Sequence, residues 1–383
     1  MSFLVAVIVS AVIVLASPFM GQLQSFLRRS LSTRNYVLLF GVGVLAAVGL
    51  AILIAFVRIR ERRAQRFALL VIALMFGGSY MWWTATPYPE VNAVERVHFV
   101  EYGLIAFLFY RAGLPRRRPG EGGRRPGDPS LVTLPMLAAF AVGTFDEWLQ
   151  WFIPFRVGEA HDVFINLAAI VCGLLFSLAL QPPAVFSSQL GTVSRRRIGV
   201  TSAIVWMIFA AFVSQVHLGH SVEIADIGRF KSHYTEQELN DLQGDRGVLW
   251  KTRPPVKMQR LSREDQYLDE GLAHVRRRNG AEVDEAWREN LILERFFVPV
   301  LDLPTYASPN GNRWPPDQRA DFANRASTNG AFLSEAEPYP ILAWSHAAFW
   351  IGAWVIAFVL LAVPLALSRR QRGRESSAAS SSY

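Results

Sequence analysis

The chain is dominated by a series of apolar stretches separated by short polar segments. A helix needs about 20 residues to cross the hydrocarbon core of a bilayer. Most of the stretches approach this length, and the two shortest, the fourth and the fifth, reach it if they continue into polar flanks that would then be partly buried. The eight stretches are Phe3–Phe19, Tyr36–Val57, Phe67–Trp83, Val97–Tyr110, Leu131–Phe145, Val163–Leu180, Gly199–Val216 and Ile341–Leu367.

The segment between the seventh and eighth stretches has a different pattern. Residues 217–340 hold 16 Lys and Arg against 20 Asp and Glu, so this region is mildly acidic while the whole chain carries a net charge of +8. Its length is within the normal range of a small domain. We therefore expect a separate soluble region inserted before the last span.

Helical signals are present inside this soluble region. Residues 262–278 begin with Ser262 as a cap, carry apolar side chains on one helical face, and end at Asn279-Gly280. Residues 281–297 show a second helical pattern, and residues 303–319 are rich in turn formers. The pattern predicts an all-α protein: a polytopic transmembrane bundle of about eight spans with a small, mainly helical soluble domain.

These patterns divide the chain into six regions. They are an N-terminal transmembrane pair (1–66), a four-helix membrane core (67–181), a seventh span (182–216), a helical soluble domain (217–340), a last span (341–368) and a basic, Ser-rich tail expected to be disordered (369–383).

Arginine residues predict the orientation, because basic residues collect in cytoplasmic loops. Groups of them follow the second, fourth, sixth and eighth stretches: Arg58–Arg66, Arg111–Arg125, Arg195–Arg197 and Arg369–Arg374. This alternation places those loops and the C-terminus in the cytoplasm of a bacterial inner or plasma membrane, and residues 217–340 outside. Three arginines, Arg28, Arg29 and Arg34, do not fit this alternation, because they follow the first stretch, at the end that the topology places outside. Either the first stretch does not span, or residues 21–35 lie along the interface as a basic helix.

Composition excludes several classes of site. A single cysteine, Cys172, rules out a disulfide framework and any cysteine-based metal cluster. The mean hydropathy of +0.23 suits a membrane protein. No nucleic-acid motif is present, so nucleic acid is not an expected partner, and no cofactor is expected.

Polar side chains gather at three span ends. The sets that share a helical face are His98, Glu101 and Tyr102 in residues 95–103, Glu147, Gln150 and Trp151 in residues 146–152, and Asp162, Asn166 and Gly173 in residues 161–173. The topology puts all three sets at one face of the bilayer. Since a carboxylate in hydrocarbon is costly unless it is paired or hydrated, the carboxylates are expected to face inward, near Arg96, His98 or Arg156. The sequence thus predicts a polar pocket at the outer leaflet.

These segments also resemble a known family. "ERVHFVEYG", "EWLQWFIPFR" and "DVFINLAAIVCG" are similar to the VanZ-like membrane family over residues 69–181. The matching positions are His98, Phe99, Tyr102, Glu147, Gln150, Phe152, Pro154, Arg156, Asp162, Asn166 and Gly173. Glu95-Arg96 stands where the family commonly has Asp-Lys, and Pro154-Phe155-Arg156 where it has Pro-Gly-Arg.

The resemblance implies a four-helix membrane unit. The family's namesake is linked to resistance to the glycopeptide antibiotic teicoplanin, which acts at the cell envelope, and the biochemical activity of the family is largely unassigned. The resemblance does not extend over residues 182–383.

Two interpretations of the polar pocket stay open. In the first, it binds an anionic or amide-bearing envelope molecule, such as a lipid headgroup, a glycolipid or a cell-wall precursor. Arg96 and Arg156 would then hold phosphate or carboxylate, and Glu147, Asp162 and Asn166 would take amides or hydroxyls. In the second, the cluster is an interhelical clamp that fixes helix packing.

A function of another class is also open: a structural accessory subunit of a respiratory, photosynthetic or transport complex, docking through residues 217–340. Catalysis is less well supported, because His98 beside Glu101 could act as an acid/base pair but no nucleophile and no repeated metal spacing accompany it. His217 and His220 are spaced for Zn²⁺, but no third ligand is evident. An interfacial pair is therefore the preferred interpretation.

Overall fold

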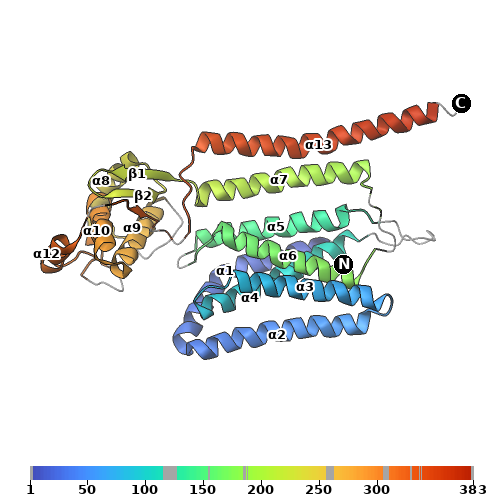
Figure 1. Cartoon of the computed structure of the whole chain (residues 1–383), viewed down its shortest axis with the longest axis horizontal. Helices are drawn as coiled ribbons and strands as arrows, with labels where there is room; N and C mark the ends of the chain where they lie inside the picture. The colour runs from blue at the N-terminus through green and yellow to red at the C-terminus, as the bar shows by residue number, and fades with distance from the viewer. Residues whose placement is uncertain are drawn as a thin grey trace. The chain divides into compact units, whose positions relative to one another are not determined.

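The computed structural model describes residues 3–114, 127–153, 156–183, 187, 189–255, 263–304, 310–327, 330–335, 337 and 339–380. The chain divides into two units, one of residues 1–149, 160–211 and 350–383, the other of residues 150–159 and 212–349. Within the described residues it forms thirteen helices and three short strands. Figure 1 labels most of these elements. Ser262, Pro154, Phe155 and most of the arginine-rich segment 111–125 lie outside the described residues.

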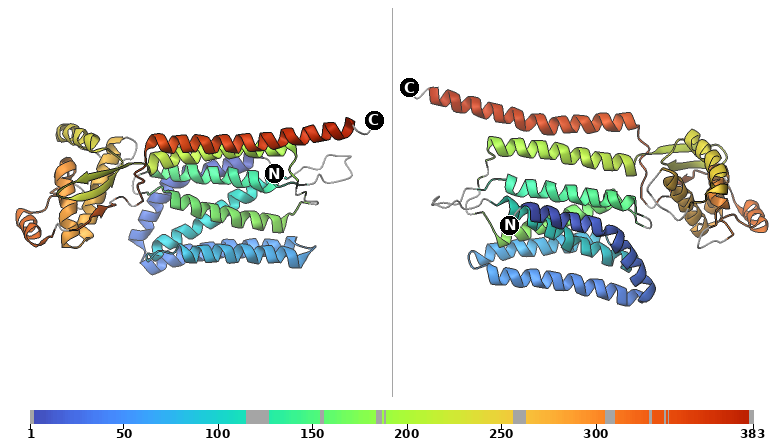
Figure 2. Two further views of the ribbon diagram at one scale, coloured as in Figure 1. Left: turned by 45° about the horizontal axis from the view of Figure 1, so that its top comes forward. Right: turned by 180° about the vertical axis from the view of Figure 1, so that it is seen from behind.

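The first unit consists of long helices, most of them running side by side (Figures 1 and 2). They are α1 (Phe3–Ser30), α2 (Thr33–Arg58), α3 (Arg63–Trp83), α4 (Pro89–Gly113), α5 (Ser130–Trp151), α6 (Ala160–Leu180), α7 (Thr192–Val216) and α13 (His346–Ser380).

Six of these helices are long and apolar enough to cross a membrane: α1, α2, α3, α6, α7 and residues His346–Leu367 of α13. The other two, α4 and α5, have 25 and 22 residues but carry the polar groups of the predicted pocket. Helix α1 continues to Ser30, so it takes residues 21–30 into the same helix as the first apolar stretch. The fold is therefore the expected all-α, polytopic membrane bundle.

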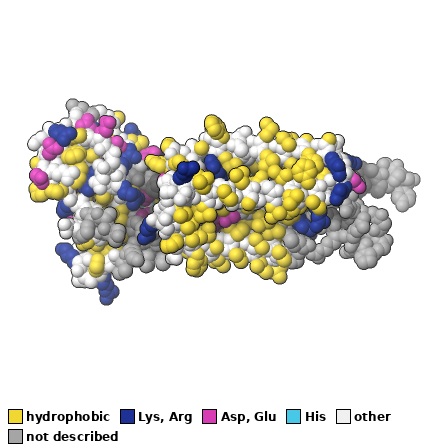
Figure 3. All heavy atoms as spheres, turned by 90° about the horizontal axis from the view of Figure 1, so that it is seen from below, with side chains coloured by type: hydrophobic (Ala, Val, Ile, Leu, Met, Phe, Trp, Pro, Cys, Tyr) yellow, Lys and Arg dark blue, Asp and Glu magenta, His cyan; other side chains and the backbone are white. Residues whose placement is uncertain are grey.

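The outer surface of this unit is apolar. Side chains such as Leu45, Leu53, Ile351 and Phe358 are between 60% and 72% exposed. Figure 3 shows one face of the unit covered by apolar side chains over the middle of the helices, with Lys and Arg gathered toward their ends. A contiguous apolar surface of this extent is rare on soluble proteins, and it suits contact with lipid acyl chains.

Helices α4 and α6 approach each other closely at a pair of glycines. A Cβ atom built on Gly173 would lie 2.6 Å from the Cα of Gly103, whereas one built on Gly103 would lie 3.9 Å from the Cα of Gly173. Small residues allow membrane helices to approach at backbone distance. Around this crossing, Tyr102, Ile105 and Ile170 form part of the buried core.

The second unit combines five helices with a small sheet. The helices are α8 (Glu236–Thr252), α9 (Arg263–Gly280), α10 (Val283–Phe296), α11 (Val298–Asp302) and α12 (Pro316–Arg325); the strands are β1 (His220–Ile224), β2 (Gly228–Ser232) and β3 (Leu333–Ser334). Helices α9 and α10 are the two that the sequence predicted. Helix α12 begins at Pro316, inside the segment expected to hold turns, because a proline at the first helical position is compatible with a helix start.

The sheet was not predicted from the sequence. Strands β1 and β2 pair antiparallel, with Val222 opposite Phe230, and β3 adds parallel to β2. Val222, Ile224 and Phe230 alternate with exposed or half-buried positions and point into the core, which is the period-two pattern of a half-buried strand. Each run is only five residues long, so the alternation is a weak signal.

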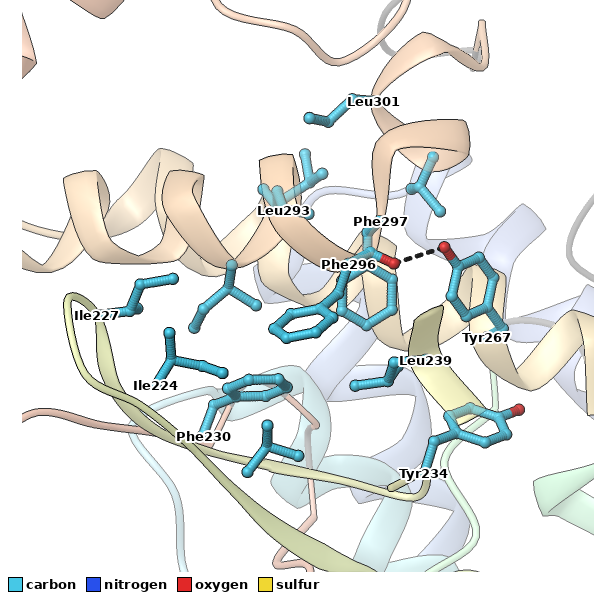
Figure 4. Close-up of a cluster of buried hydrophobic side chains, with 14 of the residues drawn as sticks. Ile224, Ile227, Phe230, Tyr234, Leu239, Tyr267, Leu293, Phe296, Phe297 and Leu301 are labelled. Atoms are coloured by element: carbon cyan, nitrogen blue, oxygen red, sulfur yellow. Dashed lines mark hydrogen bonds between the residues drawn. The ribbon is translucent and has the colours of Figure 1, made fainter. Parts of the chain in front are cut away.

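Aromatic side chains fill the core of the second unit (Figure 4). Phe230 from β2 lies 5.4 Å from Phe296 of α10, and Tyr267 of α9 stacks on Phe297 at 5.0 Å, both measured between ring centroids. The Tyr267 hydroxyl donates a hydrogen bond to the Phe296 carbonyl oxygen at 2.6 Å. The sheet and helices α9 and α10 therefore share one hydrophobic core.

The two glycines of the α4–α6 crossing should respond differently to the same substitution. Gly173→Ala places a methyl group against the Gly103 backbone, which cannot move aside as a side chain can, so the helices must separate. Gly103→Ala meets only ordinary van der Waals contacts. We expect a lower thermal midpoint in detergent for Gly173→Ala and little change for Gly103→Ala, measured by heating followed by size-exclusion chromatography. Equal midpoints for the two variants would contradict this packing.

Candidate functional site

A buried carboxylate of the helical bundle, Asp146, lies on the last turns of α5. The Ser17 hydroxyl of α1 donates to Asp146 Oδ1 at 2.5 Å, and the Tyr102 hydroxyl of α4 donates to Oδ2 at 2.7 Å. Asp146 is 4% exposed and Tyr102 is fully buried. Hydrogen bonds to an ionised acceptor are about twice as strong as neutral ones. Asp146 therefore holds α1 and α4 against α5.

A second chain of contacts begins at the neighbouring residue, Glu147. The Asn166 amide nitrogen of α6 lies 3.5 Å from Glu147 Oε1, and the Asn166 amide oxygen lies 2.9 Å from His98 Nδ1 of α4. Because the amide nitrogen faces the carboxylate, the amide oxygen is left to accept, so His98 Nδ1 carries the hydrogen. The His98 ring also stacks on Tyr102, with 5.8 Å between centroids.

We call Ser17, His98, Tyr102, Asp146, Glu147 and Asn166 the inner cluster. It connects α1, α4, α5 and α6, and all its members except the half-buried His98 are buried. Polar contacts between membrane helices contribute to packing because the alternative is an unsatisfied group in hydrocarbon. The geometry of the inner cluster fits the clamp interpretation.

A separate hollow lies where α3 ends and α4 begins. Its lining consists of Met81, Thr84, Asn92, Glu95, Arg96, Phe99 and Ile165. Arg96 is exposed at this hollow and Glu95 is half-buried. Asp162 and His161, at the start of α6, are electrostatic neighbours of Glu95. The hollow therefore combines a charged rim with apolar side chains from three helices.

Two of the lining polar groups are already engaged by local structure. Asn92 accepts hydrogen bonds from the backbone nitrogen and the hydroxyl of Thr86, at 2.8 and 2.9 Å, and donates to the Thr86 carbonyl oxygen. Thr84 donates its hydroxyl to the Tyr80 carbonyl oxygen. These bonds fix the turn between α3 and α4, and they leave Glu95 and Arg96 as the charged groups that a ligand could meet.

The other four predicted site residues belong neither to the inner cluster nor to the lining of the hollow. Gln150 and Arg156 belong to the second unit, where Arg156 Nη2 donates to Gln150 Oε1 at 2.5 Å. Glu101 is half-buried beside Tyr102, and Asp162 is half-buried at the start of α6. Of the nine residues predicted to share a pocket, His98, Tyr102, Glu147 and Asn166 lie in the inner cluster, and Arg96 lines the hollow.

Three residues of these sites were missed by the sequence analysis. Asp146 lies four residues before Gln150, but the face was chosen by counting three and four residues from Glu147, which left Asp146 out. Its position next to a predicted carboxylate was the available signal. Glu95 was considered only as a match to the family pattern. Ser17 lies 129 residues from Asp146, and nothing in its own stretch distinguishes it from a structural serine.

Comparison with known proteins gives one match. Residues 3–181 match the family model VanZ/LLP1, which includes α1 and α2 as well as the four helices for which the resemblance was expected. No curated protein and no solved structure matches the chain. The match confirms the family resemblance and assigns no activity.

Removing the Tyr102 hydroxyl should destabilise the bundle more than removing another buried phenol. Tyr102→Phe leaves a buried carboxylate with one donor fewer, at a cost of roughly 1.5–3 kcal/mol. Tyr110→Phe is the matched control, because the Tyr110 hydroxyl donates to a neutral acceptor, the Gln181 carbonyl oxygen at 2.8 Å, and its loss costs roughly 0.5–1.5 kcal/mol. Thermal unfolding in detergent measures both. A larger loss for Tyr110→Phe would refute the role of Asp146.

Proposed function

Because residues 3–181 are a VanZ-like membrane region, we propose that this multi-pass membrane protein binds an anionic headgroup of the cell envelope at the hollow between α3, α4 and α6. The headgroup belongs to a membrane lipid or to a lipid-linked cell-wall precursor. The observation that carries the proposal is the Arg96 guanidinium, which is exposed at a hollow that also contains apolar side chains.

The chemistry of the hollow suits an amphiphile. Arg96 has no hydrogen bond or ion pair among the residues that the structure describes, so its five donors are free to hold a phosphate or carboxylate group. Phe99, Ile165 and Met81 supply an apolar wall for the first carbons of a lipid chain. Glu95 lies beside Arg96 and accepts hydrogen bonds from hydroxyl or amide groups of the same molecule.

The inner cluster supports this site without being part of it. His98 follows Arg96 by two residues on α4, and its contact with Asn166 holds α4 against α6, which together provide Arg96, Phe99 and Ile165. In this proposal the two interpretations of the polar residues, ligand binding and an interhelical clamp, apply to different residues. The buried residues act as the clamp, and the charged residues at the helix ends bind the ligand.

The orientation is also part of the proposal. The arginine-rich turn between α2 and α3 lies at the opposite end of α3 from the hollow, since Arg63 begins this helix and Trp83 ends it. Because arginine-rich loops stay in the cytoplasm, the hollow opens at the extracytoplasmic face. The second unit follows the end of α7, which begins at the arginine-rich segment Arg195–Arg197, so it is also extracytoplasmic.

Substitution of Arg96 tests the binding site. We expect Arg96→Ala to bind a short-chain phosphatidylglycerol roughly ten- to hundredfold more weakly than the wild type, as loss of a charge-assisted hydrogen bond implies. Arg96→Lys should retain part of the affinity. The control is Arg58→Ala, which removes an exposed arginine from the last turn of α2 at the arginine-rich end. Titration of purified protein in detergent, followed by native mass spectrometry, gives the affinities.

Two results would reject the proposal. Equal affinities of wild type and Arg96→Ala would remove the hollow as a headgroup site. Stoichiometric co-purification of another membrane protein in mild detergent, lost on deletion of residues 217–340, together with unchanged lipid binding, would instead favour the accessory-subunit function.

A further inference from the structure

Three buried side chains of the second unit come together from separate parts of its sequence. His233 directly follows β2, Glu270 lies on α9, and Glu337 follows β3. One ligand atom from each, the His233 Nδ1 and one oxygen of each carboxylate, lies within 4.8 Å of the other two. The exposed fractions of the three side chains are 8%, 0% and 2%. This cluster lies outside the matched family region.

The cluster brings two carboxylates close together in a buried site. Two carboxylates this close cannot both remain ionised in a buried site unless a cation compensates them. Glu270 Oε2 accepts a hydrogen bond from the His233 backbone nitrogen at 3.2 Å. Glu270 Oε1 is buried and has no hydrogen-bond partner among the described residues. A fully buried carboxylate oxygen without a donor indicates that a further group belongs at this position.

The His233 ring is oriented as a metal-binding imidazole would be. Its Nε2 lies 3.0 Å from the Val216 carbonyl oxygen, so Nε2 carries the hydrogen and donates it. This bond leaves the lone pair of Nδ1 directed at the carboxylates. Ligating histidines commonly donate their second ring nitrogen to a backbone carbonyl in this way, which fixes the tautomer.

The distances between the ligand atoms suit a tetrahedral ion. His233 Nδ1 lies 3.5 Å from Glu270 Oε2 and 3.9 Å from Glu337 Oε1. An ion with bonds of roughly 2.0–2.1 Å in tetrahedral geometry separates its ligand atoms by about 3.4 Å. Small side-chain adjustments therefore suffice to bring the three groups onto one ion.

We propose that His233, Glu270 and Glu337 bind a divalent transition-metal ion, with Zn²⁺ the ion that this donor set suits best. Gln266, one turn before Glu270 on α9, provides the fourth ligand. Its Nε2 lies 3.2 Å from both His233 Nδ1 and Glu337 Oε1, and its buried Oε1 has no hydrogen-bond partner among the described residues. Rotation of the amide by half a turn brings that oxygen to the ion. The site is independent of the proposed headgroup site.

A proton is the competing occupant of the cluster. Burial lowers the pKa of His233, but the hydrogen bond with Glu270 and the charges of Glu337 and Glu270 outweigh burial, and the pKa is raised above its ordinary value. A protonated His233 would compensate one of the two carboxylates. The experiment must therefore distinguish a bound metal from a bound proton.

The pair His217 and His220 offers a matched control. His217 Nδ1 lies 2.9 Å from the Pro340 carbonyl oxygen, and the His220 ring stacks on His346 at 5.5 Å between centroids. Neither belongs to the three-residue cluster. His220→Asn removes an imidazole from the same unit and tests the two-histidine spacing noted in the sequence.

The test uses the full-length protein purified in detergent, stripped with EDTA, and dialysed against micromolar Zn²⁺ at pH 7. We expect elemental analysis to give about one Zn²⁺ per wild-type chain, as for a single structural site. Glu270→Gln and His233→Asn should lose it, and His220→Asn should retain it. Glu270→Gln keeps an oxygen for the His233 backbone nitrogen, and circular dichroism checks that the variants are folded. Zn²⁺ should raise the thermal midpoint of the wild type and not that of Glu270→Gln.

Each outcome decides the proposal. Absence of Zn²⁺ from the dialysed wild type, with no shift of its thermal midpoint on metal addition, overturns the site and leaves a proton as the occupant. Loss of Zn²⁺ in His220→Asn with retention in Glu270→Gln assigns the metal to the histidine pair instead and also overturns it. If Glu270→Gln fails to fold, Glu337→Gln replaces it, and the thermal shift of the wild type needs no variant.

Discussion

The bundle depends on how it accommodates the carboxylate of Asp146 among apolar helices. A buried ion in a membrane protein is tolerated only where the protein supplies donors, because no water is available to solvate it. Two donors to Asp146 are the hydroxyls of Ser17 and Tyr102, from helices far apart in sequence. The requirement to satisfy one carboxylate therefore fixes the positions of α1 and α4 relative to α5. The close glycine crossing then fixes α6 against α4.

The hollow at the ends of α3 and α4 follows from this packing. Once one face of α4 is held by Asp146 through Tyr102 and by Asn166 through His98, its first turns carry Glu95 and Arg96 beyond the inner cluster. Charged groups at a helix end can reach water or lipid headgroups, whereas the same groups one or two turns deeper would need internal partners. Arg96 and His98 are only two residues apart on α4, so the face of the helix on which each residue lies, more than its depth, separates groups that hold the bundle from groups that can meet a ligand.

Sequence patterns predicted the helices well because helix formation has a local periodic signal. Helices α9 and α10 follow the expected apolar spacing. The convergence of His98, Glu147 and Asn166 was also predictable, since all three lie near span ends that the topology places at one face.

Pairings between distant segments were not predictable. Phe230 of β2 pairs with Ser334 of β3, and Ser17 reaches Asp146 across 129 residues. No spacing rule relates such positions. The extent of the family match could not be predicted either. The polar residues that identify the family lie in α4 to α6, whereas α1 and α2 are mostly apolar.

Both units bury carboxylates, but the groups that surround them differ. In the bundle, hydroxyl and amide groups are among the partners of Asp146 and Glu147. In the second unit, Glu289 meets the His274 imidazole at 2.7 Å and the Arg277 guanidinium at 3.1 Å. Glu289 therefore has a permanent cation beside it and needs no additional one. Glu270 has the imidazole and the backbone nitrogen of His233 beside it, with Glu337 close by. Glu289 and Glu270 lie in one domain, on adjacent helices. Their different surroundings are the reason to expect an additional cation at Glu270 and not at Glu289.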